Sequence, residues 1–418
     1  MPGLDEGRRM DVPNILLLSG SVPGCPGVGG VILGDLCRLY PRGRISCFAV
    51  VPADRVAGQV ARRDPLPTRI RSAPHQREPV SRFGPLGRLV AWWMKRRRVR
   101  RCIQGLLREA ADFARTQGVT QIWSVLDCPT TVEMTAPLAA ALRVPLVSLV
   151  WDDFRDVCER SNLWDLSRRL LGRQFGAALR ASERCAVICE NMKRRYEQEY
   201  GTRGVVLQHG VRSALVCPPA ARPGTSGPFR IGYAGSVTAA RTFESLLTAL
   251  ASSRWRIAGR PVRLTLMGRR FEVSSRGTPA HVTYLGWRSH EECIRRLSET
   301  DVTYLPQPFD PRFQPRATLS FPTKLTTYLA AGRPILVHSP PGSSLAAFFK
   351  QHPVGVWCSE LDQGAVLQAL TRLLTEDEIY ARATDAGRAA LERQFTEGIF
   401  RRAFAQFVGV DENHLTTP

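Results

Sequence analysis

The sequence predicts two tandem α/β domains, each built on a doubly wound parallel sheet. The chain has 418 residues, which exceeds the size at which one hydrophobic core usually stops growing. Short apolar runs alternate with helical patterns, which is typical of strands buried on both faces. A segment rich in Pro, Gly and Ser at 217–229 interrupts this alternation, which then restarts.

The first half of the chain contains apolar runs that we predict to be strands. They lie at 14–20, 45–51, 121–126, 145–150 and 185–189. Each is separated from the next by enough residues for a crossover helix, as a parallel sheet requires. The first run is followed by a glycine-rich loop and a predicted helix over 31–40.

The second half repeats this organisation. Predicted strands lie at 230–234, 263–267, 282–285, 302–305, 334–337 and 354–357, and predicted helices lie at 243–251, 290–299, 325–331 and 363–374. In open sheets of this kind, ligands bind beyond the carboxyl ends of the strands. We therefore expect the site in a cleft between the two domains.

The formal net charge is +21, from 58 basic and 37 acidic residues. Few of the basic residues are lysines, namely Lys95, Lys193, Lys324 and Lys350. This excess favours anionic ligands such as nucleotide diphosphates or acidic lipid headgroups. The basic residues are scattered and accompany no recognition module, so we expect no specific nucleic-acid partner.

Cysteine usage and the N-terminus indicate the compartment. Cys25, Cys37, Cys47, Cys185 and Cys189 lie within or beside apolar runs and form no CxxC pair, which indicates buried free thiols in a reducing compartment. The polar N-terminus does not resemble a signal peptide, and no run of about eighteen apolar residues is present. We expect a cytoplasmic protein, either free or attached to the inner face of a membrane.

The segment 83–103 departs from the α/β pattern. It places Trp92 and Trp93 beside a block of cations that begins at Lys95. Such a helix fits an anionic membrane surface, with aromatic rings at headgroup depth and cations on phosphates. It equally fits an ordinary helix whose tryptophans pack on the domain and whose basic face is solvated.

The glycine-rich loop after the first strand has features of an anion site. Gly29 and Gly30 stand where a helix is expected to begin. Glycines allow a ligand to approach the backbone closely, and a helix N-terminus offers free N–H groups to phosphate. A tight turn between a strand and a helix also uses glycine, so a structural role is equally consistent.

The strand that opens the second domain has similar features. It ends in Gly235 and Ser236, and Arg241 follows near the start of a helix. Arg241 is placed to neutralise a diphosphate. In so arginine-rich a chain, Arg241 and also Arg269, which follows the next strand, are equally consistent with surface solvation.

The most specific motif is the segment 321–337. Phe321, Pro322 and Thr323 lead into a short helix that starts near Lys324. A lone lysine is usually a surface residue. This one is among few in the chain and lies at a helix start facing the expected cleft, where it is placed to meet a leaving diphosphate.

These motifs together resemble the donor domain of family 4 glycosyltransferases. The resemblance covers 232–337 in order and spacing, through Gly232-Tyr-Ala-Gly-Ser236, Leu285-Gly-Trp287, Asp301-Val-Thr-Tyr-Leu-Pro306 and the segment around Lys324. The N-terminal half is similar more loosely, through its glycine-rich loop and the segments 144–153, 186–192 and 208–211.

The resemblance implies a GT-B fold of two Rossmann-like domains. It places an acceptor-side domain at 1–215, a linker at 216–228, a donor domain at 229–390, and a helix that crosses back, with the tail, at 391–418. It implies retaining transfer of a sugar from a UDP- or GDP-sugar to a glycan or lipid-linked acceptor, in the synthesis of a surface polysaccharide or glycolipid. No metal or other cofactor is expected.

The resemblance also implies roles for the candidate residues. Arg241 and Lys324 would stabilise the charge that builds on the leaving diphosphate. Asp152 and Asp153 would orient the acceptor or accept its proton, although a capping role before a helix also fits them. Donor contacts fall to Gly29, Gly30, Gly235, Ser236, Arg269, Phe321, Pro322, Thr323 and Thr327.

Some positions depart from the family pattern. The family often has two glutamates around the helix of the third motif, the second contacting the donor ribose, and here Leu319 and Thr327 stand at those positions. Trp151 stands where relatives often have a histidine. A GT-B sugar-nucleotide epimerase and a non-catalytic nucleotide-sugar-binding protein are therefore kept as alternatives to a transferase.

Overall fold

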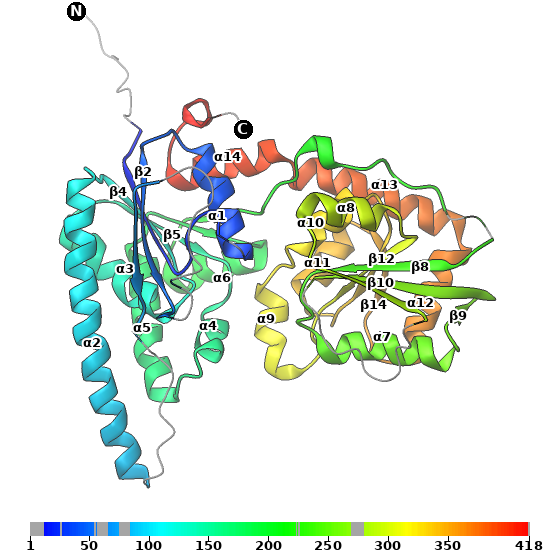
Figure 1. The fold of residues 1–418 in the computed structure, drawn as a ribbon, viewed down its shortest axis with the longest axis horizontal. Helices are drawn as coiled ribbons and strands as arrows, with labels where there is room; N and C mark the ends of the chain where they lie inside the picture. The colour runs from blue at the N-terminus through cyan, green and yellow to red at the C-terminus, as the bar shows by residue number, and fades with distance from the viewer. Residues whose placement is uncertain are drawn as a thin grey trace, which may run out of the picture. The chain divides into compact units, whose positions relative to one another are not determined.

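The structure is a computed structural model of the chain. It describes residues 12–25, 27–53, 56, 66–74, 84–222, 224, 226–268 and 280–416. The chain forms two compact units, one made of Met1–Leu207 with Arg401–Pro418 and the other of Gln208–Phe400. Each unit contains a parallel sheet with helices packed on it (Figure 1), so the predicted fold class is confirmed.

The sheet of the first unit has the spatial order β3-β2-β1-β4-β5-β6-β7, and its neighbouring strands are parallel. The strands are β1 (Ile15–Ser19), β2 (Ile45–Val51), β3 (Thr68–Ser72), β4 (Gln121–Val125), β5 (Leu146–Val150), β6 (Arg184–Val187) and β7 (Gly204–Val206). The strand order reverses between β1 and β4, and ligands of such sheets bind at this switch point.

Helices from both ends of the chain pack on this sheet. They are α1 (Val28–Leu39), α2 (Pro85–Thr116), α3 (Pro129–Leu142), α4 (Phe154–Arg160), α5 (Asp165–Ala181), α6 (Glu190–Tyr200) and α14 (Glu397–Val408). The buried Trp123 ring on β4 lies 5.4 Å from that of Phe404 and 5.9 Å from that of Phe407, both on α14. The C-terminal segment is thus part of the core of the first unit.

The sheet of the second unit has the order β11-β10-β8-β12-β13-β14, with β9 pairing antiparallel to β10. Its strands are β8 (Phe229–Ala234), β9 (Arg256–Ile257), β10 (Arg260–Met267), β11 (Val282–Gly286), β12 (Val302–Pro306), β13 (Ile335–His338) and β14 (Gly355–Cys358). Its helices are α7 (Ala240–Ser252), α8 (His290–Ser298), α9 (Gln314–Leu319), α10 (Lys324–Ala330), α11 (Ser344–Gln351), α12 (Gln363–Thr375) and α13 (Asp377–Gln394). The switch point of this sheet lies between β8 and β12.

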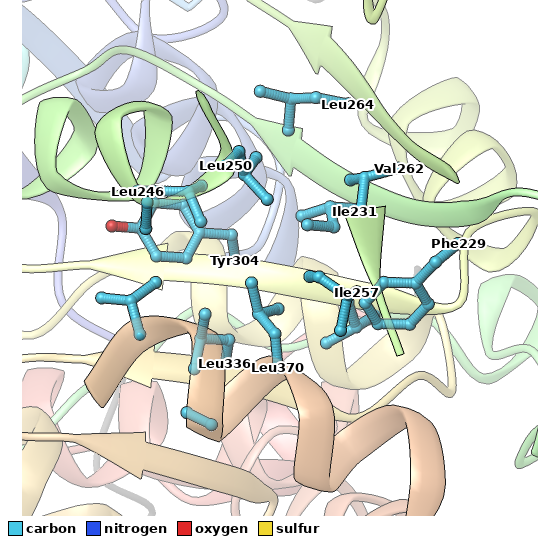
Figure 2. Packing of buried hydrophobic residues seen from close by; sticks show 14 of the residues in the cluster. Phe229, Ile231, Leu246, Leu250, Ile257, Val262, Leu264, Tyr304, Leu336 and Leu370 are labelled. Carbon is cyan, nitrogen blue, oxygen red and sulfur yellow. The ribbon is translucent and has the colours of Figure 1, made fainter. Parts of the chain in front are cut away.

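One core of the second unit lies between its sheet and two helices (Figure 2). Leu246 and Leu250, one turn apart on α7, are fully buried, as are Ile231 on β8, Tyr304 on β12 and Leu370 on α12. Burying a side chain of this size stabilises the fold by about 1.5–3 kcal/mol. This packing fixes the strands whose carboxyl ends carry the candidate site.

The predicted strands are all present, with boundaries that differ by at most three residues. The strands that the sequence analysis missed are β3, β7 and β9, which are short or lie at sheet edges and carry fewer buried apolar residues. The helix predicted over 31–40 instead begins at Val28, so Gly29 and Gly30 lie within α1 rather than before it. The segment 216–228, expected as a linker, falls within the second unit.

Candidate functional site

Three neighbouring strands of the second unit end on glycines with positive φ. They are Gly235 after β8, Gly268 after β10 and Gly286 at the end of β11, with φ of 111°, 126° and 70°. A Cβ atom at residue 268 would lie 2.6 Å from the carbonyl oxygen of Gly235. Only glycine fits these positions without strain, and it lets backbone segments approach one another closely at the carboxyl edge of the sheet.

Lys324 is the first residue of α10, and its side chain lies across the end of β8. Its Nζ donates to the hydroxyl of Tyr233 and to the carbonyl oxygen of Ser236, both at 2.5 Å. The same Nζ lies 4.5 Å from the centroid of the Tyr233 ring. A Cβ atom at residue 235 would approach Lys324 Cε to 2.5 Å, so the lysine occupies space that a glycine leaves.

The environment of Lys324 changes its titration. Burial, with a smaller contribution from Arg316, lowers the pKa of Lys324 to about 7. A bound anion would favour the protonated form and raise this pKa again. The lysine therefore has the properties of a cation that becomes fully charged when a phosphate group arrives.

Arg241 lies on the other side of the switch point, in the first turn of α7, and its side chain is exposed. Hydrogen bonds from Arg312, with a smaller contribution from the charge of Arg241, lower the pKa of Asp310 to about 2. The guanidinium of Arg241 is therefore near Asp310, after β12. Arg241 follows β8 in the sequence, and the side chain of Lys324 lies against the residues that end the same strand.

Thr327 lies one turn along α10 from Lys324. Its hydroxyl is 3.1 Å from Nε2 of His290, the first residue of α8. The ring of His209 lies 6.3 Å from that of His290, measured between centroids. The Thr327 hydroxyl and the rings of His290 and His209 thus lie together one turn from Lys324. A glutamate at position 327 would instead supply a charged group there.

The remaining candidates of the third motif have packing roles in the structure. The Phe321 ring packs against Phe348 and Phe395, with centroids 5.6 and 6.2 Å apart. Leu319 is 2% exposed and belongs to the core rather than to the edge of the sheet. Pro322 and Thr323 accept hydrogen bonds within the turn that begins α10. Arg269 lies outside the described residues.

In the first unit, the two glycines of α1 are explained by close packing. A Cβ atom at Gly30 would lie 2.4 Å from the carbonyl oxygen of Cys25, and Gly30 is buried. A Cβ atom at Gly29 would lie 2.9 Å from Cζ3 of Trp151. Gly29 is half-buried, so of this pair it is the one that remains accessible to a ligand.

The two aspartates after β5 differ in their surroundings. Asp153 is 4% exposed; it caps α4 by accepting from the backbone N–H of Arg155 at 3.2 Å, and it accepts from the Tyr196 hydroxyl at 3.1 Å. Asp152 is half-buried and pairs with Arg160 at 2.7 Å. The structure therefore gives Asp153 the capping role that the sequence analysis left open, while Asp152 remains at the surface of the site.

The sequence analysis missed one ionisable residue at the switch point of the first unit. Asp127 follows β4, beside the end of β1, and its Oδ1 accepts from the backbone N–H of Gly20 at 3.2 Å. Burial raises the pKa of Asp127 to about 6, against the opposing effects of hydrogen bonds and of Arg160. Its signal in the sequence is a carboxylate directly after an apolar strand, as at Asp152.

All eleven cysteines are free, and the five that were predicted to be buried are buried. Among the described residues, no group of three or more His, Cys, Asp or Glu side chains is arranged to hold a metal ion.

Several solved structures are similar to this chain over nearly its whole length. HepE of Anabaena, in complex with UDP, is similar with a TM-score of 0.62 and 15% identity, over 95% of this chain and 99% of that chain. The chain has the GT-B fold. Sucrose-phosphate synthase from Thermosynechococcus elongatus gives a TM-score of 0.63 at 14% identity over 95% and 97% of the two chains.

A further GT-B relative in structure is the lipopolysaccharide outer core galactosyltransferase WaaB, with a TM-score of 0.63 at 11% identity, over 94% of this chain and 99% of that chain. No protein-family model and no curated protein matches the sequence. At these identities the likeness establishes the GT-B fold, and the activity has to be argued from the site.

Proposed function

We propose that the protein is a glycosyltransferase that moves a sugar from a UDP- or GDP-sugar to a glycan or lipid-linked acceptor. The observation that carries this proposal is Lys324, a lysine of lowered pKa held over Gly235 beside the switch point of the second unit. Solved structures of HepE, which has the same fold, hold UDP or UDP-glucose. A nucleotide diphosphate bound at the carboxyl edge of the second unit's sheet would bring its phosphates to this lysine.

In the proposed reaction, the oxygen of an acceptor hydroxyl bonds to the anomeric carbon, and the bond from that carbon to the diphosphate breaks, with its electron pair leaving on the phosphate. The proton of the acceptor hydroxyl passes to the departing phosphate. Retention requires attack from the face that the diphosphate leaves. Lys324 and Arg241 stabilise the developing negative charge, which is the main contribution that a protein makes to such a step. No metal or other cofactor is part of this proposal.

The ribose of the donor is assigned to Thr327 and His290. A diphosphate at Lys324 places the next part of the nucleotide about one helical turn away, which is about 5.4 Å along α10. Thr327 lies there, hydrogen-bonded to His290. A hydroxyl and an imidazole offer both a donor and an acceptor to a sugar hydroxyl, so this pair takes the place of the family glutamate.

For the acceptor we assign Asp152 rather than Asp153, because Asp153 is committed to capping and to Tyr196. Replacing Asp152 with Asn should lower the turnover number while leaving affinity for the nucleotide diphosphate nearly unchanged. The same change at Asp153 should lower the melting temperature instead, and it serves as the matched control.

The acceptor end of the reaction is proposed to lie at an anionic membrane surface, to which α2 attaches. Trp92 donates a hydrogen bond to Ser167 at 2.8 Å and is docked on the first unit, whereas Trp93 is 56% exposed. An exposed apolar stripe at helical spacing lies along the same stretch of α2, formed by Leu86, Leu89, Val90, Trp93 and Met94. The described helices include none that is long and apolar enough to span a membrane.

Charge on α2 selects the kind of surface. Arg97 lies over the Trp93 ring, with 5.5 Å between its Cζ and the ring centroid, and Arg98, Arg100 and Arg101 are exposed nearby. The amino end of α2 extends beyond the sheet of its own unit (Figure 1). Exposed rings next to arginines suit an interface of acyl chains and anionic headgroups.

The transferase proposal is tested by binding and turnover. The melting temperature should rise with UDP or with GDP, because a ligand of the folded state stabilises it. Lys324→Met should reduce this rise, while Lys350→Met, at an exposed lysine of α11, should not. Product analysis then distinguishes transfer from epimerisation, and binding without any turnover would indicate a non-catalytic protein.

A further inference from the structure

Two side chains at the carboxyl edge of the second sheet bury polar atoms that have no hydrogen-bond partner within the described part of the chain. They are Oε1 of Gln307, directly after β12, and Oγ of Ser339, directly after β13. Gln307 is 6% exposed and Ser339 is fully buried. Native proteins rarely leave buried polar atoms unpaired, and an orphan at a candidate site indicates a missing partner.

The two residues are neighbours across the sheet. Pro306 on β12 pairs with His338 on β13, and the backbone N–H of Gln307 continues this ladder by donating to His338 O at 2.8 Å. Gln307 and Ser339 therefore extend adjacent strands by one residue each. Their unpaired atoms come from two independently buried side chains at one place in the fold.

This place adjoins the proposed diphosphate site. Strand β12 borders β8 at the switch point, and β8 ends at Gly235, against which Lys324 packs. On the other side, the hydroxyl of Thr242 donates to Gln307 O at 2.8 Å, and Thr242 follows Arg241 in the first turn of α7. Gln307 is thus fixed beside the turn that carries one of the two proposed phosphate-binding cations.

The chemistry of the two unpaired atoms selects the class of ligand. His338, which precedes Ser339, has its Nδ1 2.9 Å from the Tyr304 hydroxyl and its Nε2 2.6 Å from Glu360 O. Burial lowers the pKa of His338 to about 4, so it is neutral at pH 7. The unpaired amide oxygen and hydroxyl suit the hydroxyls of a sugar better than a phosphate, because a sugar hydroxyl can donate to an amide oxygen and a phosphate anion cannot.

We propose that Gln307 and Ser339 bind the hydroxyls of the sugar that the protein transfers, with Gln307 Oε1 accepting from one hydroxyl and Ser339 Oγ bonding to another. This inference rests on the proposed function, since it places the sugar next to the diphosphate. The pair would then determine which hexose the donor site accepts, because a hydroxyl of the wrong configuration leaves a buried polar atom unpaired.

The test compares nucleotides with and without a sugar. Calorimetry on the full chain measures affinities for UDP, UDP-glucose and UDP-galactose, and for GDP, GDP-glucose and GDP-mannose. Gln307→Met and Ser339→Ala should keep the affinity for the free nucleotide within about twofold and lower that for the preferred nucleotide-sugar roughly three- to tenfold. Gln363→Met, at an exposed glutamine of α12, is the control and should change neither.

Stability gives a second measurement on the same variants. Each removes a polar atom that is unpaired without ligand, so both should melt no lower than the parent protein. Unchanged affinities for every nucleotide-sugar, or equal losses for nucleotide and nucleotide-sugar, would overturn the sugar assignment alone. If the parent binds none of these nucleotides or nucleotide-sugars, the donor site and the proposed function are wrong, and this inference is overturned with them.

Discussion

Binding of UDP should take up a proton, because Lys324 has a pKa of about 7 in the ligand-free protein. A diphosphate beside the ammonium favours its charged form and raises the pKa. Above pH 7 the lysine is increasingly neutral before binding and has to be protonated to bind. The affinity for UDP should therefore fall as the pH rises, and this change should occur above pH 7 rather than below it.

The size of the effect follows from this pKa. With a free pKa of about 7, and a bound pKa above 9, affinity should fall about twentyfold between pH 7.5 and pH 9. A terminal phosphate loses its last proton near pH 6, so UDP itself does not titrate in this range. At pH 8 the binding of one UDP should take up about 0.9 proton.

Titration calorimetry measures both quantities, with UDP in two buffers of different ionisation enthalpy at pH 8 and with a pH series. Lys324→Arg keeps a charge whose pKa exceeds 12 and should give a flat pH profile without proton uptake. Lys324→Met should bind more weakly and also show a flat profile. A pH-independent affinity of the parent protein, or the same slope in Lys324→Met, would refute the assignment of the diphosphate to this lysine.

Three further predictions concern separate parts of the chain. The parent protein should bind UDP roughly threefold to tenfold more tightly than its 2′-deoxy or 3′-deoxy analogue. His290→Ala or Thr327→Val should remove this preference. An equal loss of affinity for UDP and for both analogues in these variants would contradict the ribose assignment. Asp127→Asn should raise the free energy of unfolding at pH 7.5 by up to about 3 kcal/mol. The reason is that burial raises the pKa of Asp127 from 3.8 to about 6, so that the charged carboxylate destabilises the fold above that pH. Urea unfolding should show that this gain in stability shrinks toward pH 4. Trp93→Glu should abolish sedimentation with vesicles of anionic lipid, and binding of the parent protein to these vesicles should weaken as the salt concentration rises. Trp92→Phe, which keeps an aromatic ring at the docked position, is the control. Equal binding of the parent protein to neutral vesicles would argue against the charge-based attachment.

The sequence was sufficient for the central strands because they are buried on both faces. Continuous apolar runs such as Ile15–Ser19 and Ile45–Val51 have few alternatives to a strand in a parallel sheet. The edge strand Thr68–Ser72 carries two arginines, and none of its residues is fully buried. Its pairing with β2 is determined by the neighbouring strand, which hydrophobic patterning does not reveal.

The candidate site was predictable where a single residue type implied its role. Gly235 and Lys324 belong to this class, since a glycine after a strand and a lysine at a helix start each suggest a phosphate. Gln307 and Ser339 do not, because their significance lies in being buried, adjacent and unpaired. The two residues are adjacent because they follow the paired ends of β12 and β13, which are separated in the sequence. No local sequence motif reveals this pairing.

The two aspartates after β5 show why the position of a residue type in the sequence leaves roles open. A carboxylate after an apolar strand can cap the next helix or face a ligand, and both outcomes follow from the same pattern. Tyr196, on α6, selects between them by donating to Asp153 and helping to bury it. Asp152 has no such cover and pairs with Arg160 instead. Whether each of these adjacent aspartates has a structural role or is available to a ligand therefore depends on whether other side chains of the same unit bury it.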